Sequence, residues 1–353
     1  MFNNKAFGLD IGTTSIKAIW LTKQKNGFQL TSHIIAPTPI KGMLSEAPLD
    51  KEEIANAIKK AVETAKITTK NVNIALAENQ VYTKVIEMPA LSDKELYLAI
   101  NWEAEQYIPV PLSSIYLVWT VLNPSQKNQR QVNNKIRVLI VGAPTVTIDK
   151  YQKILAMSGL SVVAIETEIL SVIRALAYQK EEGKNKFPPS IILNIGAVST
   201  ALALVIDGIV AFTYSIPVGG IAMNRAIEVD LGISLMQAEE YKKVYGIYRG
   251  GTSEKIGKAL EPILNSILSE VKKVMILYSQ KFKEGIPIQQ ILLSGGTARL
   301  PGIDIFFAQY SGIETVIANP WKILASDQQL PQDLRNRASD YTVAIGLAMR
   351  GYE

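Results

Sequence analysis

The chain has 353 residues, of which 48% are hydrophobic, and this is enough for roughly two or three domains with large buried cores. It contains no cysteine, so disulfides, thiolate metal sites and a thiol nucleophile are excluded. The net charge of +5 is mild, and lysines and glutamates are interleaved in the predicted helices, which indicates solvated helix faces and no nucleic-acid partner. No segment approaches the roughly 18 uninterrupted apolar residues of a membrane-spanning helix, so we expect a cytoplasmic protein. The single histidine, His33, fits a surface strand better than a catalytic site.

The first 80 residues predict a mixed sheet covered by helices. Residues 5–35 have the pattern of consecutive strands, and residues 71–77 that of a further strand. Between them, residues 49–64 have the apolar spacing of an amphipathic helix, with Asp50 as its N-cap. This order suits one half of an α/β protein.

Residues 81–158 interrupt this pattern and predict an inserted α+β subdomain. The polar residues 123–135 within it predict an exposed hairpin tip. The expected elements are a strand at 81–89, a Glu-rich helix at 93–107, strands at 115–122 and 136–141, and a closing helix at 147–159.

The rest of the chain predicts a second mixed sheet. Residues 183–189 mark a boundary between the two halves, and Pro262 is expected in the first turns of a long helix or at a point that divides it. Helices are expected at 169–180, 221–231, 236–245, 253–282 and 338–349. We therefore divide the chain into a first half (1–80 and 159–187), the insert (81–158) and a second half (188–353).

Residues 8–19 predict a strand that runs into a phosphate-binding turn. Gly12 lets the backbone approach an anion, Thr13 and Thr14 offer hydroxyl and amide donors, and Lys17 adds a positive charge. Asp10 could hold a magnesium ion through water. The spacing differs from the Walker P-loop. An ordinary β-hairpin with Gly and Thr in its turn explains this stretch alone equally well.

Two later segments extend the pattern. Residues 190–205 repeat the layout of strand, polar residue, Ile-Gly, hydroxyl residues and strand, so the chain has two matching halves. Residues 291–303 predict a strand that leads into a Gly-Gly turn and a helix, where a flat ring can approach the backbone. The candidates from the second and third segments are Gly196, Ser199, Thr200, Gly295 and Gly296.

These three elements, in this order, resemble the actin-like ATPase superfamily, which includes actin, sugar kinases, chaperone ATPases, MreB, FtsA and PilM. The resemblance implies an α/β fold of two related mixed-sheet halves around a cleft that binds ATP and Mg. It implies that Lys17 matches the phosphate-contacting lysine of actin. Further nucleotide contacts implied by it are the glycine pair Gly219 and Gly220, Glu239 and Lys242 on one helix face, and Arg299 against the adenine. A surface ion pair is the alternative for Glu239 and Lys242.

Hydrolysis is expected to be slow or absent. Asn194 stands where active relatives have an aspartate, which removes one negative charge from the magnesium side of the site. Nucleotide binding can survive this change. Glu168 best matches the water-orienting position, with Glu166 as second choice, and either could instead be an ordinary acid at a helix N-terminus.

Four stretches narrow the resemblance to PilM, the pilus family of this superfamily. They are residues 85–89, 94–96, 99–111 and 343–351. The resemblance implies an ATP-binding scaffold at the cytoplasmic side of the inner membrane, held there through the N-terminal segment of PilN. That segment is expected in a groove between the first half and the insert. Tyr107, Ile108 and Trp119 are candidate groove residues, with core packing as their alternative.

Two other functions are alternatives to the pilus scaffold. The first is a filament protein of the FtsA or MreB kind. The insert disfavours this function, and so does the expectation that no tail follows the final helix. A sugar or acetate kinase would need a catalytic aspartate at the cleft, and Asn194 opposes it. The sequence leaves open whether the chain forms a homo-oligomer, whether nucleotide changes partner affinity, and whether the chain serves pili or a secretion system.

Overall fold

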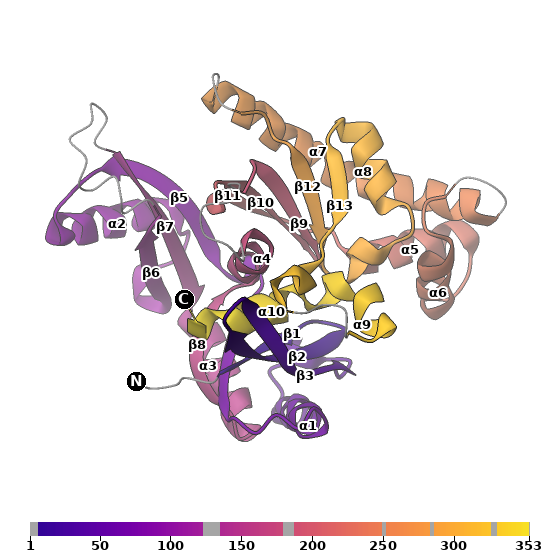
Figure 1. Cartoon of the computed structure of the whole chain (residues 1–353), viewed down its shortest axis with the longest axis horizontal. Helices are drawn as coiled ribbons and strands as arrows, with labels where there is room; N and C mark the ends of the chain where they lie inside the picture. Colours follow the sequence, from indigo (N-terminus) through magenta and orange to yellow (C-terminus); the bar gives the residue numbers. More distant parts are fainter. Residues whose placement is uncertain are drawn as a thin grey trace.

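The structure is a computed structural model that describes residues 6–122, 135–178, 187–248, 252–282, 286–325 and 330–352. Most of the expected hairpin tip (123–134) and part of the expected boundary (183–186) lie outside these residues. The described residues form two lobes and a smaller insert at the left of the view (Figure 1).

Two five-stranded sheets have the same strand order, β3-β2-β1-β4-β8 and β11-β10-β9-β12-β13. In each sheet three strands form an antiparallel meander, and two later strands then pair in parallel beside the first of them. This repeat confirms the two related halves. The strands are β1 Phe7–Ile11, β2 Ser15–Gln24, β3 Gly27–Pro37, β4 Asn71–Leu76, β8 Ser161–Thr167, β9 Ser190–Ile195, β10 Thr200–Ile206, β11 Ile209–Ile216, β12 Gln290–Ser294 and β13 Glu314–Ile317.

Helices cover both faces of the two sheets, which is why the central strands β1 and β9 are buried along their whole length. On the first sheet α1 (Pro48–Thr64) packs on the outer face. On the second sheet the outer helices are α5 (Gly220–Leu231), α6 (Leu235–Tyr245), α7 (Thr252–Lys281) and α8 (Ile303–Ser311). Between the sheets lie α4 (Glu168–Ala177) and α10 (Thr342–Met349), whose apolar side chains form the core that joins the halves.

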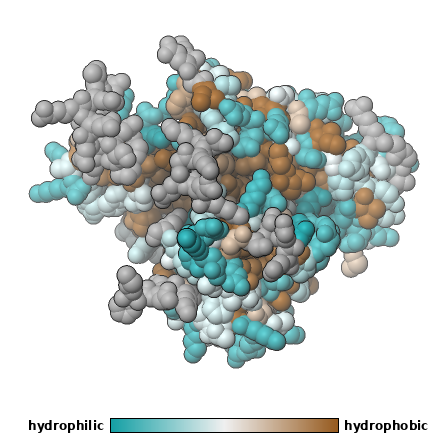
Figure 2. Space-filling model, viewed as in Figure 1, coloured by the Kyte–Doolittle hydropathy of each residue, from teal (hydrophilic) through white to brown (hydrophobic). Residues whose placement is uncertain are grey.

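In its described residues, 81–122 and 135–144, the insert has one α-helix on a three-stranded sheet with the order β5-β7-β6. Its elements are β5 (Tyr82–Pro89), α2 (Asp93–Tyr107), β6 (Ile115–Val121) and β7 (Lys135–Pro144). The insert also touches the second half, where β5 runs past β11 and Lys281 pairs with Glu87 at 2.5 Å. Figure 2 shows apolar side chains along this junction.

The helix that was expected to close the insert packs in the core of the first sheet. This helix, α3 (Thr145–Met157), buries Tyr151, Ile154 and Leu155 in the same core as strand β1 and helix α1. The apolar spacing of α3 is the same whichever sheet it covers, so the sequence could not assign it.

The C-terminal segment, which was expected in the second half, packs against strands of the first sheet. Helix α10 packs on β1 and α4, and all eight of its residues are buried. Two glycines permit this close packing: a Cβ on Gly8 would lie 2.1 Å from the carbonyl oxygen of Ala344, and one on Gly346 would lie 1.8 Å from that of Ser171.

The predicted elements differ from the observed ones at a few places. The helix α2 has the expected bounds, but strand β8, strand β13 and the short helix α9 (Gln332–Asn336) were missed. The long helix α7 runs on through Pro262 and is not divided there, since this residue is exposed and water can satisfy the carbonyl group that the proline frees.

Candidate functional site

The two predicted phosphate turns have the same backbone geometry. In the first, the Gly12 amide donates to the Ser15 carbonyl oxygen at 3.1 Å; in the second, the Gly196 amide donates to that of Ser199 at 2.9 Å. Each turn joins the first two strands of its sheet. Thr13 and Thr14 are exposed at the tip of the first turn, as a donor role requires.

Beside the first turn, Asp10 and Lys17 form a buried ion pair. They face each other across β1 and β2, with Lys17 Nζ 2.8 Å from Asp10 Oδ2. Burial alone would lower the pKa of Lys17, but the neighbouring carboxylate of Asp10 outweighs it and the pKa is raised. The lysine is therefore charged at neutral pH. Among the described residues no group of three or more His, Asp or Glu could hold a metal.

Glu168 lies at the start of α4 and approaches both turns. Burial raises its pKa well above the usual value, and the negative charges of Asp10 and Glu78 add to this effect. Asn194, from the second turn, donates an amide hydrogen to Glu168 Oε2 at 3.0 Å. An aspartate at this position could not donate, so the asparagine holds the acid in place.

Glu78 is a buried acid of this site that sequence reasoning missed. Its Oε1 accepts a hydrogen bond from the Ile169 amide at 2.8 Å, at the N-terminus of α4. Burial raises the pKa of Glu78 to about 7. Only the fold brings it near Glu168, because the two residues are 90 positions apart.

Glu166, the second choice for the water-orienting role, is held elsewhere. Its carboxylate accepts hydrogen bonds from Arg174 (2.8 Å to Oε2) and from Arg350. The acid is thus a structural ion-pair partner that ties β8 to the C-terminal segment.

The second turn is closed by the start of α5. The Gly220 amide donates to the Gly196 carbonyl oxygen at 2.9 Å, and a Cβ on Gly219 would lie 2.7 Å from the same oxygen. Backbone packing therefore explains Gly219, whereas a Cβ on Gly220 would lie 2.7 Å from the hydroxyl oxygen of Thr297 and 3.2 Å from Lys242 Nζ. The hydroxyl of Thr200 is buried and donates to the Val218 carbonyl oxygen at 2.7 Å, so it is engaged and does not point to a ligand; Ser199 is half-buried at the turn.

The Gly-Gly turn at the end of β12 leaves open space. Gly295 has a φ of 87° and would clash with the Ile195 carbonyl oxygen if it carried a Cβ. Gly296 is exposed, and Asp340 Oδ1, 3.8 Å away, is the nearest described atom to the position of its Cβ. Nothing in the described structure demands a glycine there, so the room over Gly296 suits a flat ring.

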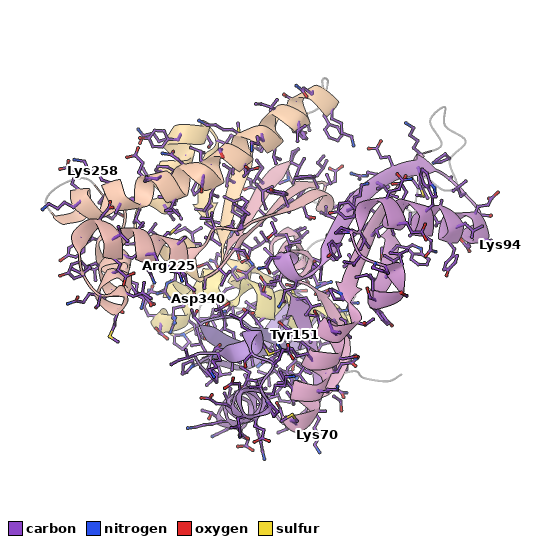
Figure 3. The ribbon with its side chains drawn as sticks, turned by 180° about the vertical axis from the view of Figure 1, so that it is seen from behind. Lys70, Lys94, Tyr151, Arg225, Lys258 and Asp340 are labelled. Atoms are coloured by element: carbon purple, nitrogen blue, oxygen red, sulfur yellow. The ribbon has the colours of Figure 1, made fainter. Side chains whose placement is uncertain are left out.

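Arg299 is oriented by Asp340, a second residue that sequence reasoning missed. Arg299 and Arg337 both donate to Asp340 Oδ2, at 2.9 and 3.2 Å. Asp340 is buried in the middle of the molecule, between the halves (Figure 3).

Lys242 also points inward, whereas Glu239 does not pair with it. Lys242 Nζ donates to the Gly220 carbonyl oxygen at 3.0 Å, and burial lowers its pKa to about 8. Glu239 pairs with Lys243 at 2.9 Å on the exposed side of α6. The alternative of a Glu239–Lys242 surface pair is therefore wrong.

A groove of about 240 Å³ separates the first half from the insert. Strand β8 forms one wall, and β6 forms the other with Tyr116 and Val118, which are 61% and 47% exposed. The three candidate groove residues lie elsewhere. Ile108 is buried in the core of the insert, Trp119 packs partly under α2, and Tyr107 donates to the Thr83 carbonyl oxygen.

The fold and the paired turns define a protein of the actin-like ATPase class. Solved structures of this class include MreB5 of Spiroplasma citri bound to ADP. The match to it covers 96% of this chain and 93% of the MreB5 chain, with a TM-score of 0.53 and 15% identity. At this identity the likeness shows the fold alone.

Within this class, the chain belongs to the family of the type IV pilus assembly protein PilM, whose sequence pattern matches residues 8–352. A solved PilM-PilN type IV pilus biogenesis complex contains a chain with a TM-score of 0.84 and 25% identity, over 99% of both chains. Cell division protein FtsA of Streptococcus pneumoniae is 24% identical over 350 residues, which are 89% of this chain and 75% of that protein. The resemblance to PilM is confirmed. In the described part of the chain no helix combines the length and apolarity needed to cross a bilayer.

Proposed function

We propose that the chain is an ATP-binding scaffold that captures the N-terminal segment of PilN and so joins the inner-membrane platform of a type IV pilus. The observation that carries this proposal is the groove between β8 and β6. Its position agrees with that expected for the PilN segment, and the likeness to the PilM chain of the solved PilM-PilN complex supports the partner.

The walls of the groove suit an extended peptide. Strand β8 is the last strand of its sheet among the residues that the structure describes. One side of its backbone has no strand partner among them, and an added peptide strand can use it. Exposed apolar side chains at Tyr116, Val118 and Val163 offer contacts for alternate residues of such a peptide. In this arrangement the backbone hydrogen bonds would contribute affinity, and the side-chain contacts would contribute specificity.

ATP is proposed to lie across the two turns, with its base over Gly296. The exposed first turn and Lys17 would receive the phosphates, and Arg299 and Lys242 would lie near the base and ribose. Magnesium would neutralise phosphate oxygens, with Asp10 as its proposed protein partner through water. The fit rests on the open space at Gly296 and on the clustering of these groups.

Turnover is proposed to be slow. Because its pKa is raised, Glu168 keeps its proton to a higher pH than an ordinary glutamate and is less available to accept the proton of an attacking water, and Asn194 adds no charge to bind the metal. The scaffold role needs binding and no rapid hydrolysis. The filament function of FtsA and MreB relatives is the second candidate, favoured only by the shared fold.

We also propose a division into structural units that follows the packing. The insert is residues 81–144, the second half is residues 187–318, and the remaining described residues form the first half. The burial of α3 and of the C-terminal segment in first-half cores supports these limits.

Calorimetry with a synthetic peptide from the N-terminus of PilN measures whether this chain binds that segment, and so tests the partner assignment. Tyr116→Asp and Val163→Asp, both in the groove, are expected to weaken binding by roughly tenfold or more because each buries a charge against the peptide. Val229→Asp, at a 78% exposed site on α5, is the matched control and should bind normally. Equal binding by all three variants would place the peptide elsewhere.

A further inference from the structure

Exposed lysines gather at one end of the first sheet, where α1 and α3 end and where β4 and β8 begin. One exposed acid, Glu63, lies among them. Within the described part of the chain none of these lysines forms an ion pair, unlike Lys51 and Lys150, which both pair with Glu46. We call them the lysine pole, and its members are Lys59, Lys60, Lys66, Lys70 and Lys153.

The fold brings the lysine pole together from separate segments. Helix α1 precedes β4 and helix α3 precedes β8, so both helices end at the edge of the sheet where these parallel strands begin. The Ser161 amide, at the start of β8, donates to the Lys70 carbonyl oxygen at 2.8 Å. Ala65, Ile67 and Leu160 pack beneath in one core. Figure 3 shows Lys70 at the lower end of the molecule.

The lysine pole lies at the opposite edge of the sheet from the nucleotide turns. Asp10 lies near the carboxyl end of β1, Glu78 follows β4 and Glu168 follows β8. The lysines stand at the other ends of β4 and β8, so they do not contribute to the candidate ATP site. A single lysine at the end of each helix would complement the helix dipole. Five lysines with one acid exceed that need, and together they favour a partner with many negative charges.

The composition of the lysine pole suits an anionic lipid surface. Clusters of about four to eight cationic side chains are typical of protein surfaces that bind anionic lipids. The cluster contains no arginine and no aromatic side chain, which nucleic-acid sites commonly use. Met157, one helical turn after Lys153, is 49% exposed, so the same end of the molecule offers an apolar side chain that can enter the headgroup region.

The groove between β8 and β6 reaches this end of the molecule. Val162, near the start of β8, lines the groove, and the preceding Ser161 is bonded to Lys70. A segment of a membrane protein that occupies the groove therefore lies beside the lysine pole. This step rests on the proposed function, in which PilN brings the chain to the inner membrane.

We propose that the lysine pole binds the anionic phospholipid surface of the inner membrane directly. The contact is electrostatic, so it is weak, reversible and sensitive to salt. It orients the chain with the nucleotide cleft away from the bilayer, because the cleft opens at the opposite edge of the first sheet. It also strengthens the attachment through PilN, since both contacts are made by one molecule at the same surface.

Co-sedimentation of the full chain with lipid vesicles, in the absence of PilN, tests the contact. Phosphatidylglycerol vesicles should bind the chain at about 0.1 M salt and release it at about 1 M, whereas phosphatidylcholine vesicles should not bind it. Two double variants remove lysines from different segments: Lys59→Glu with Lys60→Glu, and Lys66→Gln with Lys70→Gln. Each lysine near the membrane contributes about fivefold to binding, so each variant should bind at least tenfold more weakly.

The matched control changes two exposed lysines of α7, Lys255→Glu with Lys258→Glu. It alters the net charge as much as the α1 variant does, but Lys258 lies at the upper side of Figure 3 and Lys70 at the lower end. The control should bind the vesicles like the unaltered chain. All three variants should bind the PilN peptide normally in calorimetry, so a loss of vesicle binding is distinct from a failure of the proposed function.

Four results would overturn the proposal. They are no binding of the unaltered chain to phosphatidylglycerol vesicles, equal binding to phosphatidylcholine vesicles, an equal loss in the α7 control, or unchanged vesicle binding in both lysine-pole variants. Duplex DNA is the competing polyanion: tighter binding to DNA than to vesicles, lost in the same variants, would assign the surface to nucleic acid instead. Circular dichroism checks folding, and if the α1 variant unfolds, the variant at Lys66 and Lys70, outside the helices, decides the test.

Discussion

The two turns share a backbone and differ in their side chains. Relative to the shared glycine, Asp10 corresponds to Asn194 and Lys17 to Ala201, while Thr13 corresponds to Ala197. The first turn therefore has charge and hydroxyl groups, whereas the second is neutral. The comparison indicates that the first half handles the charge of a ligand, and that the second contributes backbone groups and holds Glu168 in place.

Loss of the lysine from the first turn should have the largest effect. Lys17→Met leaves Asp10 buried without its partner, which is expected to destabilise the fold by about 3–5 kcal/mol and to abolish ATP binding. Thermal unfolding and fluorescent-nucleotide titration measure these two effects. The pair Asp10→Asn with Lys17→Met removes both charges and should recover much of the stability without recovering nucleotide binding. If the double variant binds ATP normally, the charge of the first turn is not used.

Acids between the turns should make stability depend on pH. The folded pKa of Glu78, about 7, lies above its unfolded value near 4.5, so its stabilising contribution is complete below about pH 4.5 and is lost as the pH rises through about 7. The loss is at most about 3 kcal/mol. Chemical denaturation at pH 5 and pH 8 measures the free energy of unfolding at each pH. The Glu78→Gln variant should lose the part of this pH dependence that Glu78 causes. An equal slope in the variant would show that Glu78 ionises normally in the folded chain.

The sequence predicted the two phosphate turns and the two related halves well. It predicted poorly the features that depend on contacts between distant segments. Glycine, hydroxyl and strand patterns predicted both turns and the order of the halves, because backbone geometry there depends on neighbouring residues. The ion pair of Asp10 and Lys17 follows from strand register. Glu78 and Asp340 reach the site only through long-range packing, and no local spacing marks them.

The same reason explains why the sequence does not indicate which core two of the helices pack in. Helix α3 and helix α10 are apolar enough to pack on either half, and only tertiary contacts decide where they lie. The groove residues were likewise missed, since Tyr116 and Val118 belong to an ordinary alternating strand whose exposed face meets β8 only in the fold.

The smallest effect on stability is expected when the second turn is made like the first. Asn194→Asp replaces the amide donor to Glu168 by a carboxylate, and a protonated Glu168 can then donate to it instead. The cost should therefore be about 1 kcal/mol at acidic pH, where Glu168 is protonated, and should grow as the pH rises and the two acids repel.

The same substitution tests why turnover is slow. The new carboxylate adds a charge on the magnesium side, so magnesium-dependent ATP hydrolysis should rise above that of the unaltered chain, as a phosphate-release assay can measure. Asn194→Ala, which removes the amide and adds no charge, is the matched control and should not gain activity. If Asn194→Asp binds ATP but hydrolyses it no faster, the missing aspartate does not limit the reaction, and the raised pKa of Glu168 becomes the remaining explanation within this site.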